Sequence, residues 1–237
     1  MINLQKQESW FDLRLEDGGP VYTETDLDRF IAEPWNAVSS LLYMLPAIYW
    51  LFRVRGRYKE YKFLVSASAL VITGSLGSTL YHAFRASRFF LIMDVLPVAV
   101  LVLSLSILFW YRVFRNGFLM AAVVVPLTAL RFLLFNVLPD KLAINLSYAL
   151  TGIIVMLPVI ILHFQKRIVY LKYILYMLPA FALALLFREM DSWQMQLLPM
   201  GTHFLWHAFS GVGTYFLLAF LYRNQIQKKH PHKSKPW

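Results

Sequence analysis

The stretch Gly77–Asp94, GSTLYHAFRASRFFLIMD, joins two long apolar runs and decides how the rest of the chain is interpreted. It carries Ser78, His82 and Asp94 among residues that are otherwise typical of membrane spans. Ionisable residues at membrane depth are energetically costly and are usually retained for a function. This stretch therefore indicates a functional site inside a membrane-embedded protein.

The apolar character of these two runs continues along most of the chain. Of 237 residues, 59% are hydrophobic, and the mean hydropathy is +0.54. The apolar residues gather in runs of about 18–22, the length that crosses roughly 30 Å of hydrocarbon. We therefore expect an all-α, polytopic membrane protein, a seven-transmembrane helix bundle. Its spans are expected near residues 35–52, 63–83, 90–111, 118–138, 142–164, 169–187 and 199–222.

This bundle leaves little of the chain for other domains. We expect an N-terminal extramembrane segment over residues 1–34, with a short interfacial helix near Leu27–Ala32, a transmembrane domain over 35–222 and a basic cytoplasmic tail over 223–237. The N-terminus lacks the basic-then-apolar pattern of a signal peptide. Because the chain has no cysteine, disulfides and thiolate metal sites are excluded.

The basic residues predict an orientation in the membrane. The loops after the first, third and fifth predicted spans, together with the tail, hold 15 of the 23 Lys and Arg residues. The other side holds 7, and Arg131 lies inside a span. Excess positive charge marks the cytoplasmic side, so the N-terminus is expected outside or in a lumen and the C-terminus in the cytosol. The formal net charge of +10 does not indicate nucleic-acid binding, because the cations are scattered over loops.

A second polar stretch, Gly201–Gly211 with the sequence GTHFLWHAFSG, carries His203 and His207 in the outer half of the last predicted span. Residues four apart share a helix face, so these two histidines could grip one ion. On the predicted topology, Ser78 and His82 lie at a similar depth in the second span. The sequence therefore predicts that polar groups from distant parts of the chain meet.

Three imidazoles would leave the fourth tetrahedral position of zinc open for water, which is typical of a catalytic site. Zinc so held lowers the pKa of water and polarises a carbonyl. Asp94 could take the proton from that water or orient a histidine, and Ser78 could bond an oxyanion. Other interpretations stay open. A histidine could bond a neighbouring helix, the His203–His207 pair could hold haem, Asp94 could cap a helix, and Ser78 could allow close helix packing.

Three acidic residues, Glu24, Asp26 and Glu33, cluster before the first predicted span. Hard oxygen ligands close together suit calcium. The alternative is a solvated acidic surface on which Glu33 or Asn36 caps the first helix. Arg131, inside the fourth span, could reach the membrane interface or pair with a buried acid.

These motifs together resemble those of the alkaline ceramidase family, which belongs to a superfamily of seven-helix hydrolases that includes the adiponectin receptors. The resemblance rests on S-x3-H at Ser78–His82, Asp94 in LIMDVLP, H-x3-H at His203–His207, and AEPWNAVSS at Ala32–Ser40. The short chain and its Tyr22-Thr-Glu24 are more similar to the bacterial members.

The resemblance implies a zinc amidase that cleaves the N-acyl bond of ceramide, or of a related membrane lipid, to a sphingoid base and a fatty acid. It implies zinc ligands at His82, His203 and His207, with Asp94 as general base or water ligand and Ser78 as oxyanion support. For calcium it implies Glu24, Asp26 and Glu33, although the D-W part of the family's pattern is absent here.

Other functions remain compatible with the same motifs. The cavity could catalyse phospholipid ester hydrolysis or acyl transfer, or the chain could be a non-enzymatic seven-helix receptor with a structural metal. A haem protein is a further alternative. In the ceramidase-like case the lipid substrate is expected to enter sideways from the bilayer, because a two-chain lipid does not readily leave for water.

Overall fold

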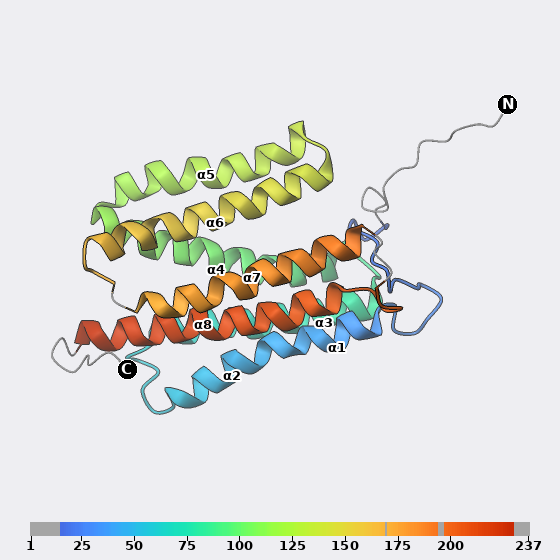
Figure 1. Ribbon diagram of the computed structural model, residues 1–237, viewed down its shortest axis with the longest axis horizontal. Helices are drawn as coiled ribbons and strands as arrows, with labels where there is room; N and C mark the ends of the chain where they lie inside the picture. The colour runs from blue at the N-terminus through green and yellow to red at the C-terminus, as the bar shows by residue number, and fades with distance from the viewer. Residues whose placement is uncertain (1–14, 169, 194–196, 230–237) are drawn as a thin grey trace. The chain divides into compact units, whose positions relative to one another are not determined.

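A computed structural model describes residues 15–168, 170–193 and 197–229 of the chain. Within these ranges the protein is all-helical and contains no strand (Figure 1). The helices are α1 (Pro34–Ser40), the 3₁₀ helix η2 (Leu41–Tyr43), α2 (Met44–Arg53), α3 (Lys62–Phe84), α4 (Arg88–Phe114), α5 (Gly117–Val137), α6 (Asp140–Phe164), α7 (Leu171–Ser192) and α8 (His203–Lys229).

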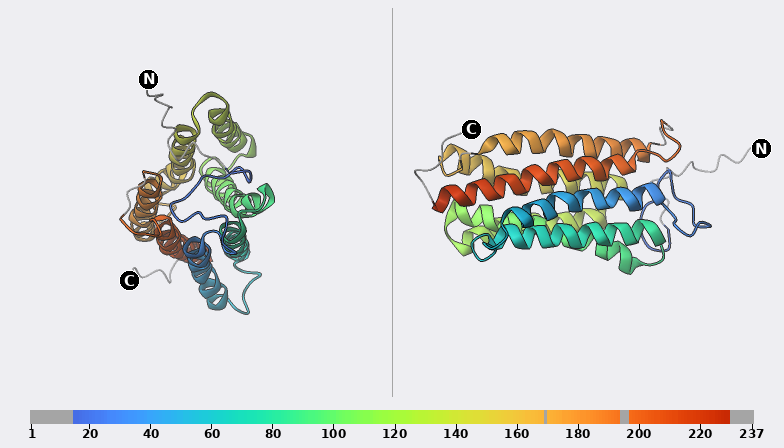
Figure 2. Two further views of the ribbon diagram at one scale, coloured as in Figure 1. Left: turned by 90° about the vertical axis from the view of Figure 1, so that its right-hand side faces the viewer. Right: turned by 90° about the horizontal axis from the view of Figure 1, so that it is seen from below.

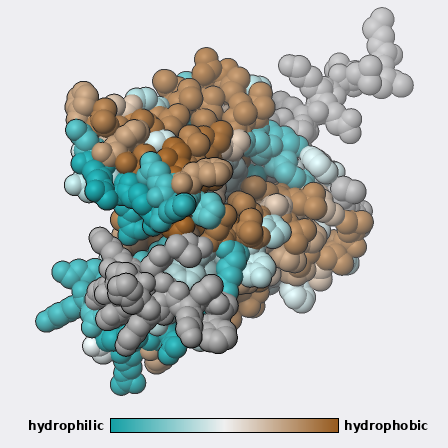
Figure 3. Space-filling model, turned by 60° about the vertical axis from the view of Figure 1, so that its left-hand side comes forward, coloured by the Kyte–Doolittle hydropathy of each residue, from teal (hydrophilic) through white to brown (hydrophobic). Residues whose placement is uncertain are grey.

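Six of these helices, α3 to α8, are long and apolar enough to cross a membrane. Many of their large apolar side chains are exposed, such as Phe118 and Phe132 on α5. Figure 3 shows hydrophobic residues over much of the visible surface, with hydrophilic residues gathered in patches. A water-soluble monomer rarely exposes so much apolar surface, so the prediction of an all-α, multi-pass membrane protein is confirmed.

The first predicted span is built differently, and the count of seven spans is not confirmed. Its residues form α1, η2 and α2 in succession rather than one long helix. The hydroxyls of Ser39 and Ser40 both donate to the carbonyl of Asn36, at 3.1 and 2.8 Å. Such back-bonding bends helices. The combined segment would still extend about 30 Å at 1.5 Å per residue, so a seventh span stays a prediction.

The chain divides into two compact units, of which the first comprises residues 1–98 and 170–237. In this unit α8 packs against α7 on one side and against α1, α2 and α3 on the other (Figures 1 and 2). Gly213 lets the α7 side chain of Phe181 approach α8, and Gly211 lies against the backbone of η2. All the predicted site residues belong to this unit.

The second unit, Ala99–Val169, contains the rest of α4 together with α5 and α6, which pack against each other. The indole of Trp110 donates to the carbonyl of Ile154 at 2.9 Å. Arg131, which the sequence left without a partner, donates to the Ser147 hydroxyl at 3.0 Å. Its hydrogen-bond partner is therefore a hydroxyl on α6 and not an acid.

The segment before α1 differs from the prediction. Residues 27–33 form turns and bends, so the interfacial helix expected near Leu27–Ala32 is not present. The backbone N–H groups of Ala32 and Glu33 donate to the carbonyls of Ala83 and His82 at the end of α3. These bonds satisfy carbonyls that a helix end leaves free. They also hold Glu33 beside His82.

The predicted domain boundaries do not coincide with the helix ends. α8 continues to Lys229, so the first residues assigned to the basic tail are helical. Residues 1–14 and 230–237 lie outside the described residues, and with them part of the predicted N-terminal segment and most of the predicted tail.

Candidate metal centre

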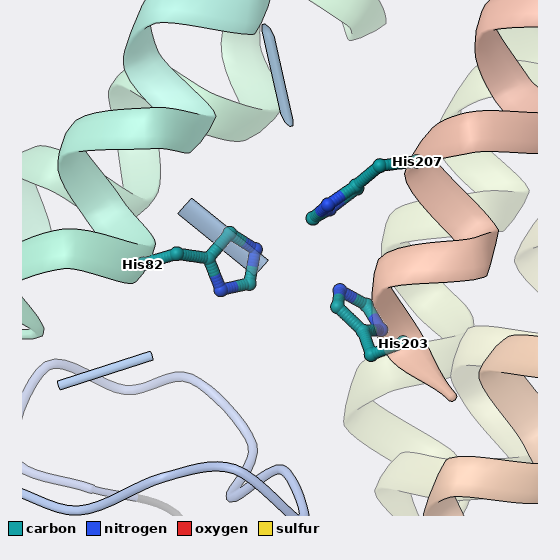
Figure 4. A group of neighbouring side chains, drawn as sticks. All are labelled: His82, His203 and His207. Atoms are coloured by element: carbon teal, nitrogen blue, oxygen red, sulfur yellow. The ribbon is translucent and has the colours of Figure 1, made fainter. Parts of the chain in front are cut away.

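The three histidines singled out from the sequence meet in the interior of the first unit. Each offers a ring nitrogen, and these nitrogens all lie within 4.8 Å of one another. Their side chains are 1–3% exposed. Figure 4 shows His82 on α3 facing His203 and His207 on α8. Nitrogen atoms gathered so closely in a buried place form a group that could hold a metal ion.

The start of α8 is fixed by Asp191 at the end of α7. Its carboxylate accepts hydrogen bonds from the backbone N–H groups of Thr202, at 2.7 Å, and His203, at 3.3 Å. The same carboxylate accepts from the N–H of Thr23 at 3.2 Å. Gly201 makes this possible, since its φ is +72° and a β-carbon there would collide with Asp191. Asp191 thus caps α8 and ties His203 to two other parts of the chain.

His82 is oriented by Glu33, whose carboxylate lies 2.5 Å from Nδ1 of the imidazole. Thr25 donates to the same carboxylate at 2.6 Å. Burial alone would raise the pKa of Glu33, but the hydrogen bond with His82 and the charge of Arg85 hold this pKa below its usual value. A carboxylate on one ring nitrogen fixes the orientation of the imidazole and leaves the other nitrogen of His82 free for a metal.

Arg85 supplies the positive charge that balances this carboxylate. Its guanidinium is buried and pairs with Glu33 and with both oxygens of Asp17, at 2.7 and 3.2 Å. It also donates to the carbonyl of Pro20 at 2.9 Å. The backbone of Arg85 ends α3 in the left-handed region, with φ at 48°, where glycine is usual. The ion pairs offset the cost of that conformation and fasten the N-terminal segment to the site.

His207 and His203 differ in their surroundings. Nδ1 of His207 lies 2.8 Å from the hydroxyl of Ser39 and 3.3 Å from that of Ser40. Within the described residues Nδ1 of His203 is buried without a hydrogen-bond partner. An orphaned buried nitrogen is costly and calls for a ligand or a water molecule. Hydrogen bonds orient the rings of His82 and His207, and His203 has a buried nitrogen without a partner. This arrangement is compatible with a metal ion bound among the three rings.

Ser78 and Asp94 lie beside the histidines, as the sequence predicts. Ser78 is buried, its hydroxyl lies 3.0 Å from that of Ser40, and it donates a hydrogen bond to the Asp94 carboxylate. Asp94 lies in the second turn of α4 and is half-buried. Gly77 permits this, because a β-carbon there would collide with the Met93 carbonyl. The close approach of α3 and α4 brings a hydroxyl and a carboxylate to the histidine cluster.

Tyr22 covers the cluster from the N-terminal segment. Its ring centroid lies 4.0 Å from that of His203 and 5.3 Å from that of His82. The guanidinium of Arg85 lies over the same ring at 5.6 Å. Tyr22 therefore packs against two of the candidate metal ligands and against the guanidinium of Arg85.

The three acids considered for calcium have other partners. Glu24 caps α1, accepting from the N–H groups of Trp35 at 2.5 Å and Asn36 at 2.9 Å. Asp26 pairs with Arg29 at 2.8 Å, and Glu33 belongs to the His82 network. Among the described residues these carboxylates do not gather as a ligand group. Calcium does not fit this arrangement, and the alternative in which acids cap the first helix describes Glu24 better than Glu33 or Asn36.

Several residues of the site were not identified from the sequence. Arg85 was counted only as a loop cation, and Asp191 only as part of a polar stretch. Arg85 directly follows an apolar run, and a cation at that position interacts favourably with the end of a helix. The partners of Arg85 lie more than fifty residues away along the chain, so no local pattern could reveal them.

Comparison with known proteins supplies an independent finding. A family model described as Ceramidase matches residues 26–237, which is nearly the whole chain. No curated protein matches. The match includes α1 to α8 and, of the candidate centre, Ser78, His82, Asp94, His203 and His207. The chain therefore belongs to the ceramidase family.

Proposed function

We propose that this member of the ceramidase family is a zinc-dependent hydrolase that cleaves the N-acyl bond of ceramide, or of a closely related membrane lipid, within the membrane. The products would be a sphingoid base and a fatty acid. Membership of the family supports the amide hydrolase activity. The observation that carries the metal dependence is the buried cluster of His82, His203 and His207.

Zinc is the metal that this set of donors suits best. Zinc in hydrolases is bound by three protein ligands, often imidazoles, with one position left for water or substrate. The carboxylate of Glu33 on His82 and the hydroxyl of Ser39 on His207 supply the supporting contacts that metal-ligating histidines typically have. A haem would require a broad planar cavity, whereas these three nitrogens lie within 4.8 Å of one another.

In this mechanism zinc supplies Lewis acidity, which polarises the amide carbonyl and makes water a better nucleophile. Asp94 accepts the proton of the attacking water and later delivers it to the leaving amine. Ser78 donates a hydrogen bond to the oxygen on which negative charge develops. The Ser78 hydroxyl is hydrogen-bonded to the Asp94 carboxylate, and its hydrogen becomes available to the developing negative charge once Asp94 has taken up the proton of water.

The surroundings of the centre support a lipid substrate. The histidines lie near the ends of α3 and α8, two helices long and apolar enough to cross a membrane. An amide near the headgroup level of a lipid would lie at this depth while its chains remain in hydrocarbon. We therefore propose that the substrate enters sideways from the leaflet on the side of the histidines.

The proposal is tested by metal analysis and lipid hydrolysis on purified protein. Wild-type protein should contain about one zinc per chain and release fatty acid from ceramide. His82→Ala, His203→Ala and His207→Ala should each lose zinc and activity. His163→Ala is the matched control, since His163 lies on α6 in the other unit and should leave both unchanged.

The same assay separates the alternatives. Hydrolysis of phospholipid esters in preference to ceramide would favour the related lipid-remodelling activity. Full hydrolytic activity in the three histidine variants would contradict the mechanism. Bound zinc without any lipid hydrolysis would favour a structural metal in a receptor.

A further inference from the structure

A second polar cavity lies in the first unit, at the end of the helices away from the histidines. It has a volume of about 190 Å³, is partly open to the outside and is lined by residues of α2, α7 and α8. Along α8 its lining begins at Tyr215, about 12 Å from His207, and extends to Arg223, about 24 Å from His207, at a rise of 1.5 Å per residue. Its lining consists of Tyr49, Trp50, Arg53, Tyr173, Tyr215, Ala219, Tyr222 and Arg223.

The lining favours an anion. It contains two guanidinium groups and four phenols, and no carboxylate occurs among its residues. None of the ion pairs within the described residues involves Arg53 or Arg223. Both arginine side chains are exposed and can turn toward a ligand. Guanidinium groups bind phosphate oxygens in pairs, and phenols add neutral donors.

The aromatic residues form a rigid frame for these arginines. The indole of Trp50 donates to the carbonyl of Tyr215 at 3.3 Å and packs against Tyr222, with ring centroids 5.0 Å apart. Tyr49 is hydrogen-bonded to Tyr215. These contacts join α2 to α8. They therefore fix the backbone positions from which the Arg53 and Arg223 side chains extend.

The neighbouring surface distinguishes a lipid from a free anion. On α2, Leu45, Tyr49 and Phe52 are 49–68% exposed and share one face at helical spacing. This face leads from the apolar middle of the helix to the cavity, as the chain of a lipid would. The cavity also lies on the side with the excess of Lys and Arg, where basic pockets between membrane helices bind anionic headgroups.

We propose that this cavity binds the phosphate headgroup of an anionic phospholipid, with Arg53 and Arg223 as the phosphate-binding residues. The acyl chains lie along the exposed face of α2. The site is separate from the histidine centre and does not depend on the function proposed for it.

The test measures lipid retention by full-length protein in detergent, using native mass spectrometry. Wild-type protein is titrated with phosphatidylglycerol and, in parallel, with phosphatidylcholine, and retention of the anionic lipid is expected to be tighter by about tenfold or more. The double variant Arg53→Ala/Arg223→Ala should lose this preference. Arg55→Ala/Lys59→Ala is the matched control, because it removes the same charge from exposed positions near the same end that do not line the cavity.

Three outcomes would overturn the proposal. Equal retention of the two lipids by wild-type protein would mean that the cavity has no preference for an anionic headgroup. Equal losses in the two double variants would attribute binding to net charge alone. Displacement of the lipid by inorganic phosphate at similar concentration would identify a site for a free anion instead of a lipid. The comparison of two lipids on wild-type protein needs no variant to fold.

Discussion

At the scale of single residues, Arg85 connects the N-terminal segment to the candidate metal centre. It lies between the carboxylates of Asp17 and Glu33, both fully buried, and Glu33 in turn bonds His82. A buried pair is costly to break, because removing one partner leaves an uncompensated charge. The guanidinium of Arg85 therefore supplies the positive charge that balances the buried carboxylates of Asp17 and Glu33.

We predict that Arg85→Gln destabilises the protein by about 3–5 kcal/mol, the cost of leaving buried carboxylates without their counter-charge. The measurement is the thermal unfolding temperature of purified protein in detergent. Arg29→Gln is the control, since Arg29 makes only a partly exposed pair with Asp26. Added calcium or a calcium chelator should leave the unfolding temperature of wild-type protein unchanged. A rise on adding calcium would show that an ion shares the role assigned to Arg85.

Asp94 allows metal binding and chemistry to be separated. Asp94→Asn keeps the shape and the bond to Ser78 but removes the proton acceptor. We expect a fall in turnover of about 10²–10⁴-fold with zinc content unchanged, as for loss of a general base. Zinc analysis and ceramide hydrolysis on the same preparation test this. If Asp94→Asn also loses its zinc, Asp94 is a metal ligand rather than a base.

At the scale of the helices, the start of α8 is positioned by contacts that come from outside it. Gly201 and Asp191 hold its first residues, and His203 is the first residue of the helix itself. A shift of the helix start would move His203 relative to His82, which is on α3. The geometry of the centre therefore depends on a turn that carries no ligand.

We predict that Gly201→Ala weakens zinc binding by about tenfold or more, comparable to loss of a supporting contact. The added methyl group would collide with Asp191, and the positive φ disfavours alanine. Zinc affinity is measured by competition with a chelator. Gly152→Ala is the control, because nothing lies within 4 Å of the β-carbon it adds to α6. Unchanged zinc affinity in Gly201→Ala would show that the cap does not position His203.

The helices also show which features the sequence could predict. Hydropathy located α3 to α8 to within a few residues at most ends, since the length of an apolar run is a local property. The meeting of His82, His203 and His207 was predicted from helix spacing and from depth. The break at η2 was not predicted, because it depends on the hydrogen bonds that the Ser39 and Ser40 hydroxyls make. The sequence also did not predict that Arg85 pairs with Glu33, one of the acids considered for calcium. Arg85 and its partners are far apart along the chain and meet only in the fold.

At the scale of the molecule, the two ends of the first unit differ in chemistry. One end holds the histidines with Asp94 and Ser78, and the other holds the cavity with Arg53 and Arg223. The charge distribution of the loops predicts that the second end faces the cytosol. A lipid hydrolase oriented in this way would act on the opposite leaflet from the one whose headgroups it binds.

This orientation can be measured, because the chain contains no cysteine and a single one can be introduced at will. We choose Asp28→Cys, exposed before α1, and Lys59→Cys, exposed in the loop between α2 and α3. A membrane-impermeant maleimide applied to intact cells should label the first variant, and should label the second only after the membrane is opened. Wild-type protein is the unlabelled control. The reverse pattern would place the histidines at the cytosolic face, because residues 28 and 59 lie at opposite ends of the α1–α2 segment; the substrate would then have to be a lipid of the cytosolic leaflet.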